Sequence, residues 1–245
     1  MPHPKLSRLE AYVAGRFDDL AGNAEMFPED LALDDWQWLA VVKVLAPISG
    51  QTVLDAGCAK GKFVARLEAE GAKAIGIDLS PALLAAARAR GLRARFLEGS
   101  VTALPFEDES FDAVICIEVL EHVPELERAL KELGRVLRPG GSLVVIDKNR
   151  AGLHPEWPYP AALYKWWGER RGRWMYSLDA PIQETWFTAS GLKDMLAKQV
   201  GPTEVSFPRR FTRTLTARLT RLLPLLSYDL LWHSQKRVKN TSIKE

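Results

Sequence analysis

The sequence contains a small-residue turn between two short apolar runs, each of which ends on a carboxylate. The first run continues into the turn as VLDAGCAKG (53–61), and the second, 74–78, closes on Gly76-Ile77-Asp78. The stretch 62–70 between them is predicted to form a helix. In such strand–turn–helix–strand units, glycines and backbone N–H groups receive a ligand's polar groups, and an acid about 20 residues on suits ribose hydroxyls. The pattern therefore predicts a nucleotide-type site in an α/β fold.

The spacing of the glycines distinguishes between two kinds of nucleotide-binding motif. A dinucleotide site needs G-x-G-x-x-G, whereas this turn has Gly57 and Gly61 with Ala59 between them. Together with Asp55, the turn resembles the D-x-G-x-G-x-G motif of class I S-adenosylmethionine-dependent methyltransferases. Ala59 stands where the middle glycine of that motif usually lies, and its methyl group would narrow the turn. A nicotinamide-dependent oxidoreductase stays open as an alternative on fold alone.

Three later motifs stand in the order that this family shows. The letters EGSVTALPF (98–106), followed by the apolar run 111–117, resemble "G-D-A-x-x-L-P-F … F-D-x-V", with Ser100 in place of the acid that reads the adenine amino group. The letters EVLEHVP (118–124) resemble its L-E-H turn, and LRPGGSLVV (137–145) its "L-R-P-G-G-x-L-V-V" phrase. The resemblance covers roughly 52–147 and is to the methyltransferase type 11 pattern.

This resemblance implies a fold, a cofactor and a set of contacts. The fold would be an α/β, Rossmann-like doubly wound sheet of seven strands, mostly parallel with an antiparallel last strand, plus N-terminal helices and an aromatic-rich insert. The cofactor would be S-adenosyl-L-methionine, with its ribose on Asp78 and its adenine against Ser100 and Val101. The residues implied to bind it are Asp55, Gly57, Ala59, Gly61, Asp78, Leu79, Ser100, Val101, Ile117 and Glu118.

Periodicity and composition divide the chain into four parts. Residues 1–50 are expected to form a helical cover, with helices at 5–20 and 33–45, and 51–149 to form the cofactor-binding core. The aromatic-rich insert, 150–187, follows the fifth strand and would wall the substrate site or fold over its own satellite core. His154, Tyr159 and Tyr164 are its candidate acceptor-binding residues. Residues 188–245 would end the sheet.

A basic amphipathic helix is predicted at 209–223. On a helical wheel its arginines occupy about half the circle and its large apolar residues the other half, and no acid interrupts the stretch. Such a helix suggests a membrane surface or an anionic partner; the alternative is that its apolar face packs on the domain. The two sets are Arg209, Arg210, Arg213, Arg218 and Arg221, and Phe211, Leu215, Leu219, Leu222 and Leu223.

The remaining candidates concern catalysis. His122 is the best candidate general base because the ordinary pKa of histidine lies near neutrality; alternatively it braces its turn. No metal is expected, since His3, His122, His154 and His233 are scattered. The net charge of +2 implies no nucleic-acid partner. Cys58 and Cys116 both lie in apolar strand or turn segments. They are therefore expected to be buried free cysteines, which suit a reducing compartment.

The sequence thus predicts an S-adenosylmethionine-dependent methyltransferase acting on a small, amphiphilic or lipid-linked acceptor. The expected location is cytoplasmic, with peripheral contact at the inner face of the membrane, because 1–20 carries charges throughout and no long apolar run is present. Two alternatives remain besides the oxidoreductase. One is a methyltransferase for a soluble natural product or metabolite, and the other is a non-catalytic, membrane-docked binding module.

Overall fold

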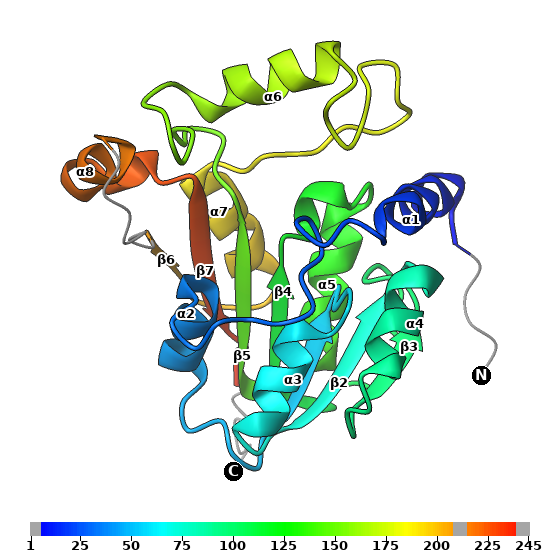
Figure 1. Ribbon diagram of the computed structural model, residues 1–245. Helices are drawn as coiled ribbons and strands as arrows, with labels where there is room; N and C mark the ends of the chain where they lie inside the picture. The colour runs from blue at the N-terminus through cyan, green and yellow to red at the C-terminus, as the bar shows by residue number, and fades with distance from the viewer. Residues whose placement is uncertain (1–5, 208–214, 239–245) are drawn as a thin grey trace.

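A seven-stranded sheet with strand order β3-β2-β1-β4-β5-β7-β6 organises the computed structural model, which describes residues 6–207 and 215–238 (Figure 1). Strands β1 to β5 are parallel, and β7 is antiparallel to both β5 and β6. The predicted doubly wound sheet with an antiparallel last strand is therefore confirmed. Its strands are β1 (Thr52–Ala56), β2 (Lys73–Asp78), β3 (Arg95–Glu98), β4 (Phe111–Ile117), β5 (Leu137–Lys148), β6 (Thr203–Ser206) and β7 (Asp229–Gln235).

Helices cover both faces of this sheet, as parallel strands require. On one face α2 (Trp36–Leu45), α3 (Lys62–Ala69) and α4 (Pro81–Ala89) enclose a core that includes Val41, Val64 and Ile115. On the other face α5 (Leu126–Val136) and α7 (Ala189–Gln199) pack over a second core. The carboxyl ends of β1, β2, β3 and β4 thus stay open at one edge of the sheet, where ligands of such folds bind.

Helix α1 (Arg8–Leu20) lies beyond that edge and begins with a capping box. The Ser7 side chain accepts a hydrogen bond from the Glu10 N–H at 3.2 Å, and the Glu10 carboxylate accepts one from the Ser7 N–H at 2.8 Å. Reciprocal bonds of this kind satisfy two N–H groups that a helix start otherwise leaves without partners. Figure 1 shows α1 above α4 and the ends of the neighbouring strands.

The insert contains a helix that the sequence analysis did not predict, α6 (Ala161–Arg170). Figure 1 shows α6 beyond the carboxyl edge of the sheet, above the other helices. Helix α8 (Leu215–Leu222) and the 3-10 helix η2 (Pro224–Leu226) precede β7; a second short 3-10 helix, η1 (Leu120–His122), follows β4. The predicted helix at 209–223 is confirmed over α8, while its residues 209–214 lie outside the described part of the chain. Within the described residues, none of the helices combines the length and apolarity that a membrane crossing needs.

Candidate functional site

The turn after β1 has the backbone of a glycine-rich turn even where it lacks glycine. Gly57 has φ 91°, and a Cβ there would lie 2.2 Å from Val119 Cγ2, so no side chain fits. Ala59 adopts φ 45°, in the left-handed region that favours glycine. Its N–H donates to Asp78 Oδ2 at 2.8 Å, which ties the turn to the end of β2. The other Asp78 oxygen accepts from the Ser80 N–H at 2.9 Å.

Asp55, the last residue but one of β1, is a buried carboxyl that lines the same space. Its Oδ2 is fully buried and has no hydrogen-bond partner among the residues that the structure describes. Burial, with a further contribution from the charge of Asp78, raises the pKa of Asp55 to about 8, while Lys62 opposes the shift. Buried polar atoms are normally satisfied, so the orphaned oxygen indicates that a ligand with a positive charge or a donor completes this site.

These groups open into one cavity at the carboxyl edge of the sheet. Nine of the ten predicted cofactor residues line it: Asp55, Gly57, Ala59, Asp78, Leu79, Ser100, Val101, Ile117 and Glu118. Gly61 is not in the lining; it adopts φ 75° as the N-cap of α3 and donates its N–H to the Cys58 carbonyl at 2.8 Å. Further lining residues come from α1 and the segment after it, and the sequence did not indicate them: Glu10, Val13, Phe17, Met26, Phe27 and Pro28.

The polar residues of the cavity follow the order of the strands along the carboxyl edge of the sheet. Ser100 follows β3, Asp78 ends β2, Asp55 is the last residue but one of β1, and Glu118 follows β4. An elongated ligand along this edge therefore meets Ser100 at one end, Asp78 in the middle, and Asp55 with Glu118 at the other end.

The hydroxyl of Ser100 is already occupied by neighbouring groups. It donates to Glu10 Oε1 and accepts from the Thr102 N–H at 3.0 Å. The Thr102 hydroxyl donates to the same Glu10 oxygen at 2.6 Å. The Ser100 hydroxyl, which was expected to accept a hydrogen bond from adenine, is thus already bonded within the protein. The carboxylate of Glu10, from α1, lies beside it.

Glu118 is a second strained lining residue. It adopts φ 56°, and its Oε1 accepts a hydrogen bond from Gln37 Nε2 of α2 at 3.1 Å. Left-handed non-glycine residues persist where the surrounding structure holds them, and they cluster at functional sites. Glu118 and Ala59 both belong to the cavity lining.

His122 also lines the cavity, but both of its ring nitrogens have partners. The Tyr176 hydroxyl lies 3.2 Å from Nδ1, and Glu121 Oε1 lies 3.3 Å from Nε2. The ring meets the Phe17 ring edge-on at 5.1 Å. These contacts favour the bracing interpretation, and general-base action would require the Tyr176 contact to open.

A buried charge cluster stands behind His122. Glu121 forms an ion pair with Lys148, and the Glu121 side chain is fully buried. Burial alone would raise its pKa, but the charges of Lys148 and His122 lower the pKa of Glu121 to about 2. Burial and the Glu121 charge raise the pKa of neighbouring Asp147, whose oxygens accept from the Glu121 and Lys148 N–H groups at 3.3 and 2.9 Å.

The three aromatic candidates of the insert do not line this cavity. The rings of His154 and Tyr159 stack at 5.3 Å, and Tyr164 meets His154 at 4.5 Å. Further ring contacts continue through Trp174 and Trp186 to Tyr228. The structure therefore brings these residues together in an aromatic cluster of the insert, as the satellite-core alternative expects, and does not place them with the cofactor residues.

Comparisons with known proteins point to one family. A family model described as a methyltransferase domain matches residues 54–145. A demethylmenaquinone methyltransferase of Beutenbergia cavernae is 35% identical over 166 residues, 67% of this chain and 68% of that protein. A ubiquinone biosynthesis O-methyltransferase of Xylella fastidiosa is 37% identical over 109 residues, 42% of this chain and 44% of that one. For the demethylmenaquinone methyltransferase of Clavibacter sepedonicus, 34% identical over 152 residues, the match spans 60% of this chain and only 62% of the relative.

Solved structures share the fold at lower identity. An S-adenosylmethionine-dependent methyltransferase of Mesorhizobium loti superposes with a TM-score of 0.63 at 21% identity, covering 83% of this chain and 99% of that one. The [4+2]-cyclase SpnF superposes with a TM-score of 0.65 at 20% identity, covering 97% and 99%. The fold alone thus accommodates a different reaction, whereas the sequence relatives and the matched domain model agree. The chain belongs to the class I S-adenosylmethionine-dependent methyltransferases.

Proposed function

We propose that this protein transfers the methyl group of S-adenosylmethionine to a small acceptor that is amphiphilic or lipid-linked. The cavity residues fit the family's cofactor. The orphaned Asp55 oxygen suits the cofactor's α-ammonium group, Asp78 suits its ribose, and the turn at Gly57 leaves no room for a side chain. S-adenosylmethionine supplies an electrophilic methyl carbon on a sulfonium, so the protein's tasks are to align an acceptor and exclude water.

The cavity end beside Glu118 suits an apolar acceptor. Phe17 lies 5.7 Å from Phe27 and 5.1 Å from the His122 ring, between centroids. Val119, Val123, Pro124 and Met26 also line the cavity. Such a surface would hold a flat apolar ring and keep water from the reacting carbon. His122, braced by Tyr176 and Glu121, would orient the ring rather than take a proton.

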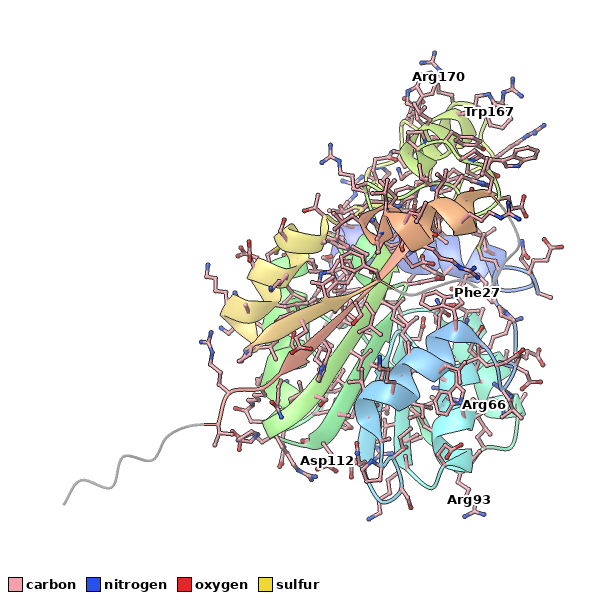
Figure 2. All side chains as sticks on the ribbon, turned by 90° about the vertical axis from the view of Figure 1, so that its left-hand side faces the viewer. Phe27, Arg66, Arg93, Asp112, Trp167 and Arg170 are labelled. Carbon is pink, nitrogen blue, oxygen red and sulfur yellow. The ribbon has the colours of Figure 1, made fainter. Side chains whose placement is uncertain are left out.

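The observation that carries the amphiphilic acceptor is an exposed aromatic surface on α6. Its inner face buries the small or polar residues Ala161, Gly168 and Glu169, whereas Leu163 and Trp166 are 57% and 51% exposed. Arg170 and Arg171 stack over Trp166 and Trp167, at 5.0 and 4.0 Å from the ring centroids. Figure 2 shows Trp167 and Arg170 directed away from the body of the molecule. Tryptophan beside cationic residues is typical of membrane-interface surfaces.

Helix α8 adds a second surface of the same character. Leu215 and Leu222 are 58% and 79% exposed, so the apolar face of α8 is not buried at these two positions. Arg218 and Arg221 are exposed on the same helix. We infer that α6 and α8 rest on an anionic lipid surface from which the acceptor enters the site. The relatives named for demethylmenaquinone and ubiquinone biosynthesis support an acceptor of the quinone type.

The test is methyl transfer followed by phase partition. Purified protein is incubated with S-adenosylmethionine that carries a labelled methyl group and with an extract of the source cells, and the products are divided between organic and aqueous phases. Label in the organic phase is the expected result. Label confined to the aqueous phase would instead support the alternative of a soluble metabolite acceptor. Absence of transfer into either phase, together with absence of cofactor binding, would favour the alternative of a non-catalytic binding module.

A further inference from the structure

Helix α1 contributes a carboxylate to a position where the family motif would have supplied one from the chain after β3. Glu10 is 6% exposed and lines the cavity next to Ser100. The loop residue that resembles the motif's acid is Ser100, and its hydroxyl donates to Glu10. A negative charge is therefore present at this end of the cavity, although it comes from a residue 90 positions earlier in the chain.

We propose that Glu10 recognises the adenine base of the cofactor and selects it by its exocyclic amino group. This inference rests on the proposed function, because it takes the ribose to lie on Asp78 and the methionine end on Asp55. With those two parts placed, the strand order leaves the Ser100 end of the cavity to the base. Adenine presents two N–H donors on its amino group, and a carboxylate only accepts.

The hydrogen bonds of Glu10 leave it capacity for this role. An ionised carboxylate accepts about four hydrogen bonds. Oε1 accepts from the Ser100 and Thr102 hydroxyls, and Oε2 accepts from the Ser7 N–H at 2.8 Å. Among the residues that the structure describes, these three bonds leave one of about four acceptor positions, on Oε2, without a donor. The same bonds lower the pKa of Glu10 against the opposing effect of burial, which keeps it ionised.

A purely structural role for Glu10 makes a different prediction, and a matched variant separates the two. Asp18, also on α1, accepts from the Ser80 hydroxyl at 2.5 Å and the Ala82 N–H at 3.1 Å, and it is not in the cavity lining. Asp18 thus docks α1 on α4 without reaching the base. If Glu10 only anchored α1, then Glu10→Gln and Asp18→Asn would affect every ligand of this cavity alike.

The experiment compares two ligands by titration calorimetry: S-adenosylhomocysteine and its inosine counterpart, which carries a carbonyl oxygen in place of the amino group. Wild type is expected to prefer the adenine form by roughly tenfold or more, the scale of a hydrogen bond to a charged group. Glu10→Gln should bring the two affinities to within about threefold, because glutamine both accepts and donates. Asp18→Asn should leave the wild-type ratio unchanged.

A double variant distinguishes loss of the carboxylate from misfolding of Glu10→Gln. Glu10→Gln with Ser100→Asp moves the carboxylate to the loop, and the preference for adenine is expected to return. A ratio in Glu10→Gln equal to that of wild type would overturn the role of Glu10 while leaving the cofactor site in place. Wild type that binds neither ligand would overturn the proposed function, and the assignment of Glu10 with it.

Discussion

The N–H of Ala59 donates to Asp78 Oδ2 across 2.8 Å, and this bond links the turn after β1 to the end of β2. The donor belongs to an alanine held at φ 45°, where a Cβ is sterically unfavourable. Asp78 therefore holds in place the strained turn on which the cofactor site depends, in addition to facing the cavity itself.

Ala59→Gly should stabilise the protein, because it removes that strain. The left-handed conformation costs an alanine about 1–2 kcal/mol, while glycine loses about 0.5–1 kcal/mol through its more flexible unfolded state. The expected net gain in the free energy of unfolding is about 0.5–1 kcal/mol, measured by urea denaturation. Gly57→Ala is the matched control and should destabilise, since its Cβ would meet Val119 Cγ2 at 2.2 Å. A loss of stability in Ala59→Gly would contradict the strained-turn interpretation.

Cofactor binding should release a proton from Asp55. In the free protein its pKa lies at about 8, so the carboxyl is mostly protonated at pH 7. A bound ligand with positive charge favours the ionised form and lowers this pKa. Binding should therefore strengthen as pH rises from 6 toward 8, with proton release detected by calorimetry in buffers of different ionisation enthalpy. Asp55→Asn should lose that release, and unchanged proton release in the variant would assign it to another group.

Removing only one charge of the Glu121–Lys148 ion pair should destabilise the protein more than removing both charges. Glu121→Gln leaves the Lys148 ammonium without its buried partner, and the expected loss is about 3–5 kcal/mol of unfolding free energy. Glu121→Gln combined with Lys148→Met removes both charges and should cost less than Glu121→Gln alone. Chemical denaturation at pH 7 measures all the variants. The unfolding free energy of Lys148→Met alone is measured as well. If the double variant loses as much of it as Glu121→Gln and Lys148→Met lose separately, added together, the two groups do not act as a pair.

Membrane contact should depend on the arginines of α8. Wild type is expected to sediment at low salt with vesicles that contain phosphatidylserine and to stay in solution with phosphatidylcholine alone, since anionic lipid attracts each basic residue. Arg218→Gln with Arg221→Gln should reduce the bound fraction several-fold. Arg93→Gln with Arg95→Gln removes the same charge from exposed residues at the other end of the sheet and is the control (Figure 2 labels Arg93). If both double variants lose the same bound fraction, the binding depends on the net charge of the protein and not on α8.

The sheet could be predicted from sequence because its determinants are local. Buried strands are continuous apolar runs such as 113–117, and their turns carry glycine or proline at the required places. The cavity residues at the strand ends were implied by the resemblance to the family's motifs, and the fold brings them together because the carboxyl ends of parallel strands meet at one edge.

Helix α6 could not be predicted, because its hydrophobic pattern is reversed. Periodicity identifies a helix when apolar residues gather on the buried face. Here the buried face holds Gly168 and Glu169, while Trp166 and Trp167 are exposed. Glu10 was missed for another reason: the apolar spacing of α1 showed where the helix would pack, but its polar partners Ser100 and Thr102 are about 90 residues away, a contact that only the tertiary fold creates.

Calorimetry with S-adenosylhomocysteine measures whether the cavity between α1 and the carboxyl edge of the sheet binds the cofactor. Asp78→Ala should weaken binding by about 1–3 kcal/mol, because the ribose and two backbone N–H groups lose their acceptor. Asp112→Ala is the control: Asp112 also accepts from a backbone N–H, that of Thr52 at 2.8 Å, but lies at the opposite edge of the sheet (Figure 2). We expect weakened binding in Asp78→Ala and wild-type affinity in Asp112→Ala if the cavity holds the cofactor. Wild-type affinity in both variants would contradict this placement of the cofactor.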